Sequence, residues 1–129
     1  MKKEVIIFIQ DISESIKKIE EYAKDINKKE FLNKEDNVQI QDAIIRRLEI
    51  IGEAVKGLPV NFKKKYPDIP WKKIAGMRDI LIHEYFGVNL ERVWVAAKKD
   101  LPELKTKILK ILKELERLEE NDKGRKLIR

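Results

Sequence analysis

The residue types best able to do chemistry gather in one short stretch of this sequence, residues 76–86. On a helix, which turns by about 100° per residue, Asp79 and His83 are i,i+4 neighbours, so the carboxylate can accept a bond from one imidazole nitrogen and fix its tautomer. Tyr85 returns to within about 20° of Arg78. A histidine can take or give a proton near neutral pH, and an arginine can neutralise charge on a phosphorane-like transition state. Together these groups form a minimal set for phosphodiester chemistry.

Each of these groups also has a purely structural explanation. A single histidine in a helical protein is more often structural than catalytic, Arg78 can pair with an acidic neighbour, and Tyr85 can cover the core with its hydroxyl in water. The polar groups nevertheless span about 160° of the helix and are interrupted by Ile82 and Phe86, so the helix has no clean solvent face. We therefore expect it to be partly buried against a second surface, with its polar groups lining a cleft.

Composition excludes several other kinds of site. The 129 residues include no Cys and one His, which excludes disulfide scaffolds, zinc ribbons, thiol nucleophiles and a His-rich metal site. No segment approaches the ~18 uninterrupted apolar residues of a membrane span, and none resembles a signal-peptide core, so we expect a cytoplasmic protein that has no membrane partner. Lys plus Arg outnumber Asp plus Glu by 29 to 23. This excess fits a polyanionic partner, although many lysine-rich proteins bind no nucleic acid.

Apolar periodicity predicts the helices that position these residues. Three segments repeat apolar residues at alternating spacings of three and four, which is typical of a helix with one buried face. The three seams are Val5, Ile9, Ile12, Ile16, Ile19, Ala23 and Ile26; Ile44, Leu48, Ile51, Val55 and Leu58; and Leu101, Leu104, Ile108, Ile111, Leu115 and Leu118. No strand pattern competes with them.

Capping residues predict where several helices begin. Asn33 is expected to cap the second long helix, and Asn89 a short helix that contains Val93 and Trp94. Asp100 and Glu103 have the spacing of a capping box before the last long helix.

The proline-rich middle of the chain, residues 58–70, predicts short turns rather than one long element. Pro70 is expected to open a new helix, because proline is tolerated at the first helical position. A helix over residues 77–86 is then expected to end at Gly87.

The predicted fold is all-α, an up-down bundle of four main helices with additional short helices. Residues 1–120 are expected to form one domain, and residues 121–129 a flexible basic tail. Some apolar residues lie off the seams and can be buried internally or at an oligomer interface, which favours a homodimer; these are Ile6, Phe8, Ile45 and Ile50.

The arrangement Arg78-x4-His83-x-Tyr85 resembles the Arg-x(4–6)-His-x-Tyr signature of the HepT-like proteins of the HEPN superfamily, helical toxins paired with minimal nucleotidyltransferase (MNT) antitoxins. Residues 47–56, 66–79 and 100–102 are similar to further blocks of that family, in the same order. One position departs from the pattern, because many HEPN ribonucleases have Asn directly after the motif Arg and this chain has Asp79.

The resemblance implies an all-helical HEPN-like homodimer in which two Arg/His sets meet across a cleft. It implies a metal-independent endoribonuclease toxin that needs no cofactor, within a type VII HepT/MNT-like toxin–antitoxin system. By this interpretation His83 is the general base or acid, Arg78 stabilises the transition state and Asp79 orients His83. Tyr85 resembles the tyrosine that the partner nucleotidyltransferase converts to O-AMP-tyrosine, which silences the toxin. The alternative is a non-catalytic helical partner that binds substrate for, or regulates, a nucleotidyltransferase.

Overall fold

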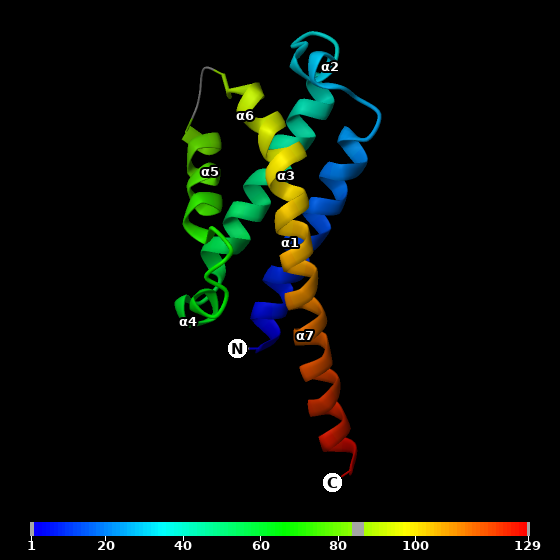
Figure 1. Ribbon diagram of the computed structural model, residues 1–129, viewed down its shortest axis with the longest axis vertical. Coiled ribbons are helices and arrows are strands. Elements are labelled where there is room, and N and C mark those ends of the chain that lie inside the picture. Colours follow the sequence, from blue (N-terminus) through cyan, green and yellow to red (C-terminus); the bar gives the residue numbers. More distant parts are fainter. Residues whose placement is uncertain (1, 84–86, 129) are drawn as a thin grey trace.

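The structure is a computed structural model that describes residues 2–83 and 87–128 of the chain, with side chains for 4–83 and 87–124. The described residues form helices and short connections and contain no strand, which confirms the predicted all-α class (Figure 1). In chain order the elements are α1 (Lys2–Ala23), α2 (Lys28–Leu32), α3 (Val38–Gly57), α4 (Val60–Lys64), α5 (Trp71–His83), α6 (Leu90–Val95), the π-helical turn η1 (Ala96–Asp100) and α7 (Leu101–Ile128). No helix within these residues is both long and apolar enough to cross a membrane.

The core forms where α1, α3 and α7 bring their apolar faces together. The first two predicted seams are buried along their whole length, and the third is buried from Leu101 to Ile111. Leu115 is half-buried and Leu118 is 40% exposed, contrary to the predicted seam. The reason is geometric, because α7 continues beyond the other helices toward its C-terminal end and has no neighbour there to cover it (Figure 1).

Two of the predicted helix caps are wrong. Asn33 ends α2 rather than beginning α3: its N–H donates to Glu30 O, and its Oδ1 accepts from the backbone N–H groups of Glu35 and Asp36 at 3.0 and 3.3 Å. Asp100 caps nothing, because α6, η1 and α7 follow one another without a break and the Leu101 N–H donates to Ala96 O. A side-chain cap competes with continued helix, and here the helical backbone continues.

Other local predictions are confirmed. The Asn89 side chain accepts from the Arg92 N–H at 3.2 Å and caps α6, which contains Val93 and Trp94. Pro70 immediately precedes α5, and its carbonyl accepts from the Ile74 N–H at 3.1 Å.

The predicted helix over residues 77–86 is not separate from the one that Pro70 precedes: a single helix, α5, runs from Trp71 and is described as far as His83, so the predicted start at Met77 is wrong. Residues 84–86 lie outside the described residues, so the predicted end of this helix at Gly87 stays a prediction; Gly87 itself has φ +132°, a conformation that favours glycine.

The C-terminal residues predicted to be a tail have helical backbone, since α7 runs to Ile128. The flexibility of this segment and the domain boundary near residue 120 stay predictions.

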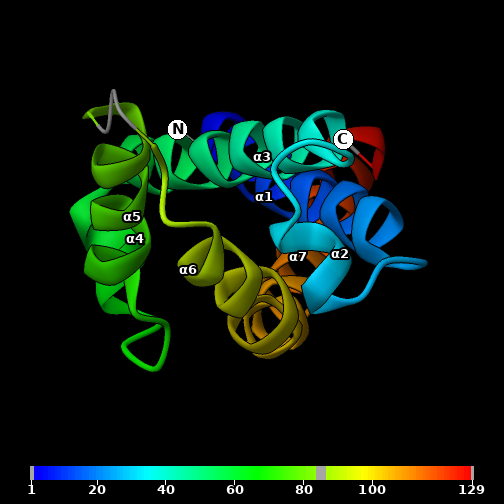
Figure 2. The ribbon, with the colours of Figure 1, turned by 90° about the horizontal axis from the view of Figure 1, so that it is seen from above.

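The helix that carries the candidate site lies at one edge of the bundle. α5 packs mainly on α3, and in the view of Figure 2 it lies with α4 on the far side of the molecule from α1 and α2. One side chain fixes its starting point: the Trp71 indole Nε1 donates to the carbonyls of Lys63 and Tyr66, both at 3.0 Å. These bonds hold the first turn of α5 against the end of α4.

Candidate active site

The contact between α3 and α5 depends on Gly52, a buried residue of α3. A Cβ at this position would overlap the Cβ of Arg78 and lie 3.2 Å from the carbonyl oxygen of Ile74. The absence of a side chain therefore lets the two helices approach closely. This approach buries the stem of Arg78, so the position of its guanidinium group is set by helix packing rather than by a free surface rotamer.

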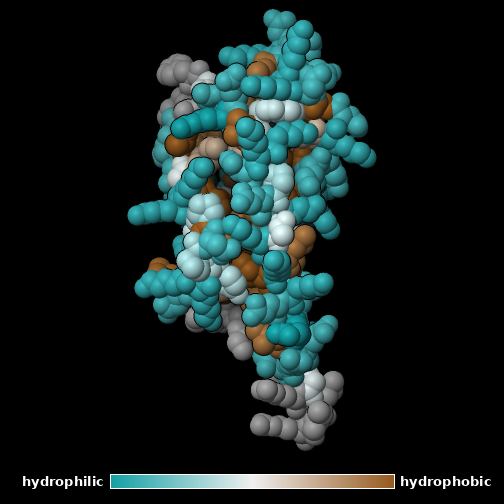
Figure 3. All heavy atoms as spheres, in the orientation of Figure 1, coloured by the Kyte–Doolittle hydropathy of each residue, from teal (hydrophilic) through white to brown (hydrophobic). Residues whose placement is uncertain are grey.

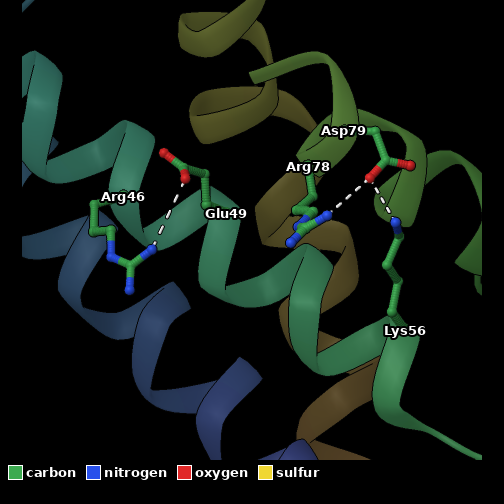
Figure 4. Close-up of polar contacts among 5 residues, drawn as sticks. All are labelled: Arg46, Glu49, Lys56, Arg78 and Asp79. Atoms are coloured by element: carbon green, nitrogen blue, oxygen red, sulfur yellow. Dashed lines mark hydrogen bonds and ion pairs between the residues drawn. The ribbon is translucent and has the colours of Figure 1, made fainter. Parts of the chain in front are cut away.

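A three-residue charge cluster lies beside this contact. The Arg78 NH1 group donates to Asp79 Oδ1 at 3.1 Å, and the Lys56 Nζ group donates to the same oxygen at 2.5 Å. Figure 4 shows Lys56 reaching this carboxylate from α3 while Arg78 reaches it from α5. Two cations thus share one carboxylate, which leaves a net positive charge at the cluster. The site is suited to an anion such as a phosphate group.

The hydrogen bond from Lys56, and then the one from Arg78, lowers the pKa of the Asp79 carboxyl below its ordinary value. Asp79 is therefore ionised throughout the neutral range. Its charge attracts both Lys56 and Arg78, and the cluster links the end of α3 to α5 by an ion pair that is partly exposed to solvent.

One donor of Arg78 is unused. Its Nε is buried and has no hydrogen-bond partner among the residues that the structure describes. An unsatisfied buried N–H of a charged group costs free energy, and active sites are one place where such groups occur. The Arg78 side chain keeps 24% of its surface exposed, so the guanidinium group can reach a ligand.

Sequence reasoning paired Asp79 with His83, and the structure gives Asp79 other partners. Within the described residues no hydrogen bond joins the two side chains, although both lie on α5 at the i,i+4 spacing. The orienting role of Asp79 therefore stays a prediction. What sequence reasoning missed is Lys56, because it lies 23 residues before Asp79 and on another helix. No local spacing could have identified it.

The two principal candidates do not face one another within one chain. His83 is exposed at the described end of α5, and Arg78 is five residues earlier against α3. Five residues on a helix correspond to about 140° of rotation and about 7.5 Å along the axis. Tyr85 lies outside the described residues, so its predicted position relative to this pair stays a prediction.

Other polar and hollow features lie apart from this cluster. Arg46 and Glu49 form a separate ion pair on α3, with 3.8 Å between NH1 and Oε2 (Figure 4). A cleft of about 320 Å³ lies between α3, α5 and the η1–α7 segment. Its lining is largely apolar and includes Leu48, Met77 and Leu104, but charged residues also line it: Asp68, Lys73, Asp100, Glu103 and Lys107. Of the predicted site residues that the structure describes, Arg78, Asp79 and His83, none lines this cleft, so it is not the polar-lined cleft that the sequence predicts.

Comparison with known proteins identifies the class of protein. The family model described as ribonuclease HepT-like matches residues 12–111, which is most of the chain and includes Lys56, Arg78, Asp79 and His83. The chain therefore belongs to the HepT-like ribonuclease family, as the sequence resemblance predicts.

Several relatives are similar over nearly the whole chain. A Thermococcus cleftensis protein named "Probable ribonuclease HepT" is 45% identical over 88% of this chain and 100% of its own length. A Methanocaldococcus jannaschii protein named "Putative RNase MJ1216" is 45% identical over 93% of this chain and 97% of its own length. A second protein of that organism, "Gamma-glutamylcyclotransferase and putative RNase MJ0434", is 52% identical over 94% of this chain, but the match spans only 53% of that longer protein. No solved structure matches the chain.

Proposed function

We propose that this chain is a metal-independent endoribonuclease, the toxin of a type VII HepT/MNT-like toxin–antitoxin system, acting on RNA in the cytoplasm. The observation that carries the proposal is the environment of Arg78. Its guanidinium group is partly exposed, is positioned by the contact with Gly52, and has a buried Nε with no partner among the described residues. The charge cluster that it forms with Lys56 and Asp79 has a net positive charge. Family membership and the ribonuclease names of its relatives support the same reaction class.

The reaction uses only groups of the chain and of the RNA. His83 removes the proton from a 2′-hydroxyl, and the 2′-oxygen attacks the adjacent phosphorus. The bond to the 5′-oxygen breaks, that oxygen takes up a proton, and a 2′,3′-cyclic phosphate is left. Arg78 stabilises the negative charge that develops on the phosphoryl oxygens. Asp79 acts on this step by holding Arg78 and, in the orienting role that we propose, His83.

A homodimer completes this proposed site. α5 packs mainly on α3, yet its other faces carry apolar residues, among them Ile80 at 40% and Ile82 at 37% exposure. Exposed apolar residues that gather on one helix favour a covering protein surface. A two-fold interface along α5 would cover them. It would also bring Arg78 and His83 of one chain near those of the other, although they point about 140° apart within a single chain.

Regulation is proposed to act through Tyr85. A cognate nucleotidyltransferase would transfer AMP from ATP to the Tyr85 hydroxyl, with release of pyrophosphate. The adenylate would add bulk and negative charge beside Arg78 and His83 and so repel RNA. This assignment rests on the family resemblance and on the position of Tyr85 two residues after His83.

The activity is tested by incubating the purified chain with RNA in EDTA and analysing the product ends. We expect cleavage that leaves 2′,3′-cyclic phosphate or its opened product. The alternative, a non-catalytic partner of a nucleotidyltransferase, predicts no cleavage of RNA and no growth arrest when the chain is expressed alone. An absence of both effects would favour that alternative.

A further inference from the structure

The positive charge of the chain is concentrated in one corner of the fold. Residues 56–73, which run from the end of α3 through α4 into the first turn of α5, contain six lysines and one aspartate, a net charge of +5. The whole chain has a net charge of +6. Almost all of the excess therefore lies in 18 residues, and the rest of the chain is nearly balanced.

The fold brings these lysines together instead of separating them. The bonds from the Trp71 indole to the carbonyls of Lys63 and Tyr66 hold the first turn of α5 against the end of α4. The ring of Phe62 adds to this corner, since it packs 5.2 Å from the Tyr66 ring, centroid to centroid. Lys64 and Lys65 at the end of α4 are thereby placed near Lys72 and Lys73 at the start of α5.

Two of the nearby acidic residues, Asp68 and Glu114, already have partners, while the described residues Asp100 and Glu103 line the same cleft as Lys73 without an ion pair to it. Asp68 lies 3.8 Å from Lys107 of α7, whose Nζ also donates to the Asp68 carbonyl at 2.8 Å. Glu114 accepts a long hydrogen bond, 3.5 Å, from the Tyr66 hydroxyl.

Lys64, Lys65, Lys72 and Lys73 are exposed, and none has an ion pair with another described residue. We call these four residues the lysine corner. Figure 3 shows hydrophilic side chains projecting from the lower left of the molecule, where Figure 1 places α4. Like charges held close together without acidic partners repel one another, so the arrangement favours an external polyanion.

The lysine corner is also continuous with the candidate active site. Lys73 precedes Arg78 by five residues on the same helix, about 7.5 Å along its axis but about 140° around it, so these two residues do not share a face. Lys72 is seven residues before Asp79 of the charge cluster, which places the two within about 20° of the same face of α5. Lys56, the first lysine of the basic segment, already contacts Asp79 in the charge cluster. A chain of phosphates lying on the corner would thus run along α5 toward Arg78.

We infer that the lysine corner is a binding track for the phosphate backbone of single-stranded RNA and delivers the strand to Arg78 and His83. This inference rests on the proposed ribonuclease function and adds to it a place where RNA is held outside the reacting groups. Lysines act here as point charges on phosphates, so the track binds RNA without reading its sequence.

The test compares two quadruple variants that have the same net charge. The first replaces Lys64, Lys65, Lys72 and Lys73 by Gln. The second, a matched control, replaces four other exposed lysines that have no ion pair with a described residue, at the opposite part of the fold: Lys17, Lys24, Lys29 and Lys34. Lys56 and Lys63 stay unchanged, because the former contacts Asp79 and the latter donates to the Val55 carbonyl.

Binding is measured with a 2′-O-methyl RNA oligonucleotide, which the 2′-hydroxyl route cannot cleave, over a series of salt concentrations. For single strands each phosphate contact contributes about 0.7 to the slope of log K against log salt, or about fivefold in affinity at 0.1 M salt. We expect the lysine-corner variant to bind about 100-fold or more weakly at 0.1 M salt and to lose about 2–3 from the slope. The control variant should stay within about threefold of the parent.

Two results would overturn the inference, and they differ in what else they affect. If both quadruple variants lose affinity equally while the parent cleaves ordinary RNA, only overall charge matters and the track does not exist, but the proposed function stands. If the parent neither binds the 2′-O-methyl RNA nor cleaves ordinary RNA, the proposed function fails together with the track. Circular dichroism of both variants establishes that they are folded before binding is compared.

Discussion

Replacing Gly52 by Ala tests whether the α3–α5 contact positions the site. The new Cβ would overlap the Cβ of Arg78 and approach the carbonyl oxygen of Ile74 to 3.2 Å. Neither obstacle is the far end of a flexible side chain, so the helices themselves must separate. Overpacking of this kind costs about 3 kcal/mol, at the upper end of the usual range. The higher helix propensity of Ala offsets about 1 kcal/mol of that cost.

The expected net effect of Gly52→Ala is a loss of about 2 kcal/mol in the free energy of unfolding, after the gain in helix propensity. For a chain of this size that lowers the melting temperature by about 6–10 °C. Because Arg78 moves with α5, RNA cleavage should fall more than the loss of folded protein explains.

Gly76→Ala is the matched control for this prediction, since a Cβ at Gly76 of α5 has no neighbour within 4 Å. In Gly76→Ala only the helix propensity changes. We expect its free energy of unfolding to equal that of the parent or to exceed it by up to about 1 kcal/mol. Thermal unfolding by circular dichroism and a cleavage assay at a temperature where both variants are folded decide the matter. A Gly52→Ala protein with the melting temperature and the cleavage rate of the parent would refute the packing argument.

Three further predictions concern the charge cluster, the tyrosine and the dimer. Because the pKa of Asp79 is lowered, its ion pairs should stabilise the fold at and above the pH range in which an ordinary aspartate titrates, and be lost only as the pH falls through the lowered pKa. NMR titration should show that Lys56→Gln raises the pKa of Asp79. An unchanged titration midpoint of Asp79 would contradict the charge cluster. The Tyr85→Phe variant should not be AMPylated by a cognate nucleotidyltransferase with ATP. Peptide mapping that finds the adenylate on another residue would show that Tyr85 is not the modified residue. The double substitution Ile80→Asp and Ile82→Asp should dissociate the dimer in sedimentation analysis. A parent chain that is already monomeric at micromolar concentration would exclude a site completed by two chains.

Apolar periodicity predicted the core of this fold well. Ile9 of α1, Ile51 of α3 and Ile108 of α7 are each at most 1% exposed, as their seams require. Burial follows from the spacing of residues along one helix, so a single sequence contains the information. The same reasoning failed at Leu118, because whether α7 has a neighbour at that depth depends on the lengths of other helices.

Helix ends and long-range contacts were harder to predict. Asn33 and Asp100 are good capping residues, but a cap forms only where the backbone leaves the helix, and tertiary packing decides that. Arg78 and His83 could be singled out because unusual residue types gather around them. Lys56 and Gly52 could not be identified from the sequence. Their importance comes from the crossing of α3 and α5, which brings together residues more than twenty positions apart.

The catalytic roles of Arg78 and His83 are tested by single-turnover cleavage of one RNA by four proteins: the parent, Arg78→Ala, His83→Ala and the control Asn61→Ala, an exposed polar residue of α4. We predict that the parent and Asn61→Ala cut RNA at the same rate in EDTA. The two site variants should be slowed by at least about 100-fold while keeping the helical spectrum of the parent. This is the lower end of the range both for losing a general acid or base, as in His83→Ala, and for losing a group that stabilises transition-state charge, as in Arg78→Ala. Parental cleavage rates in both Arg78→Ala and His83→Ala would contradict the assignment of these residues to catalysis.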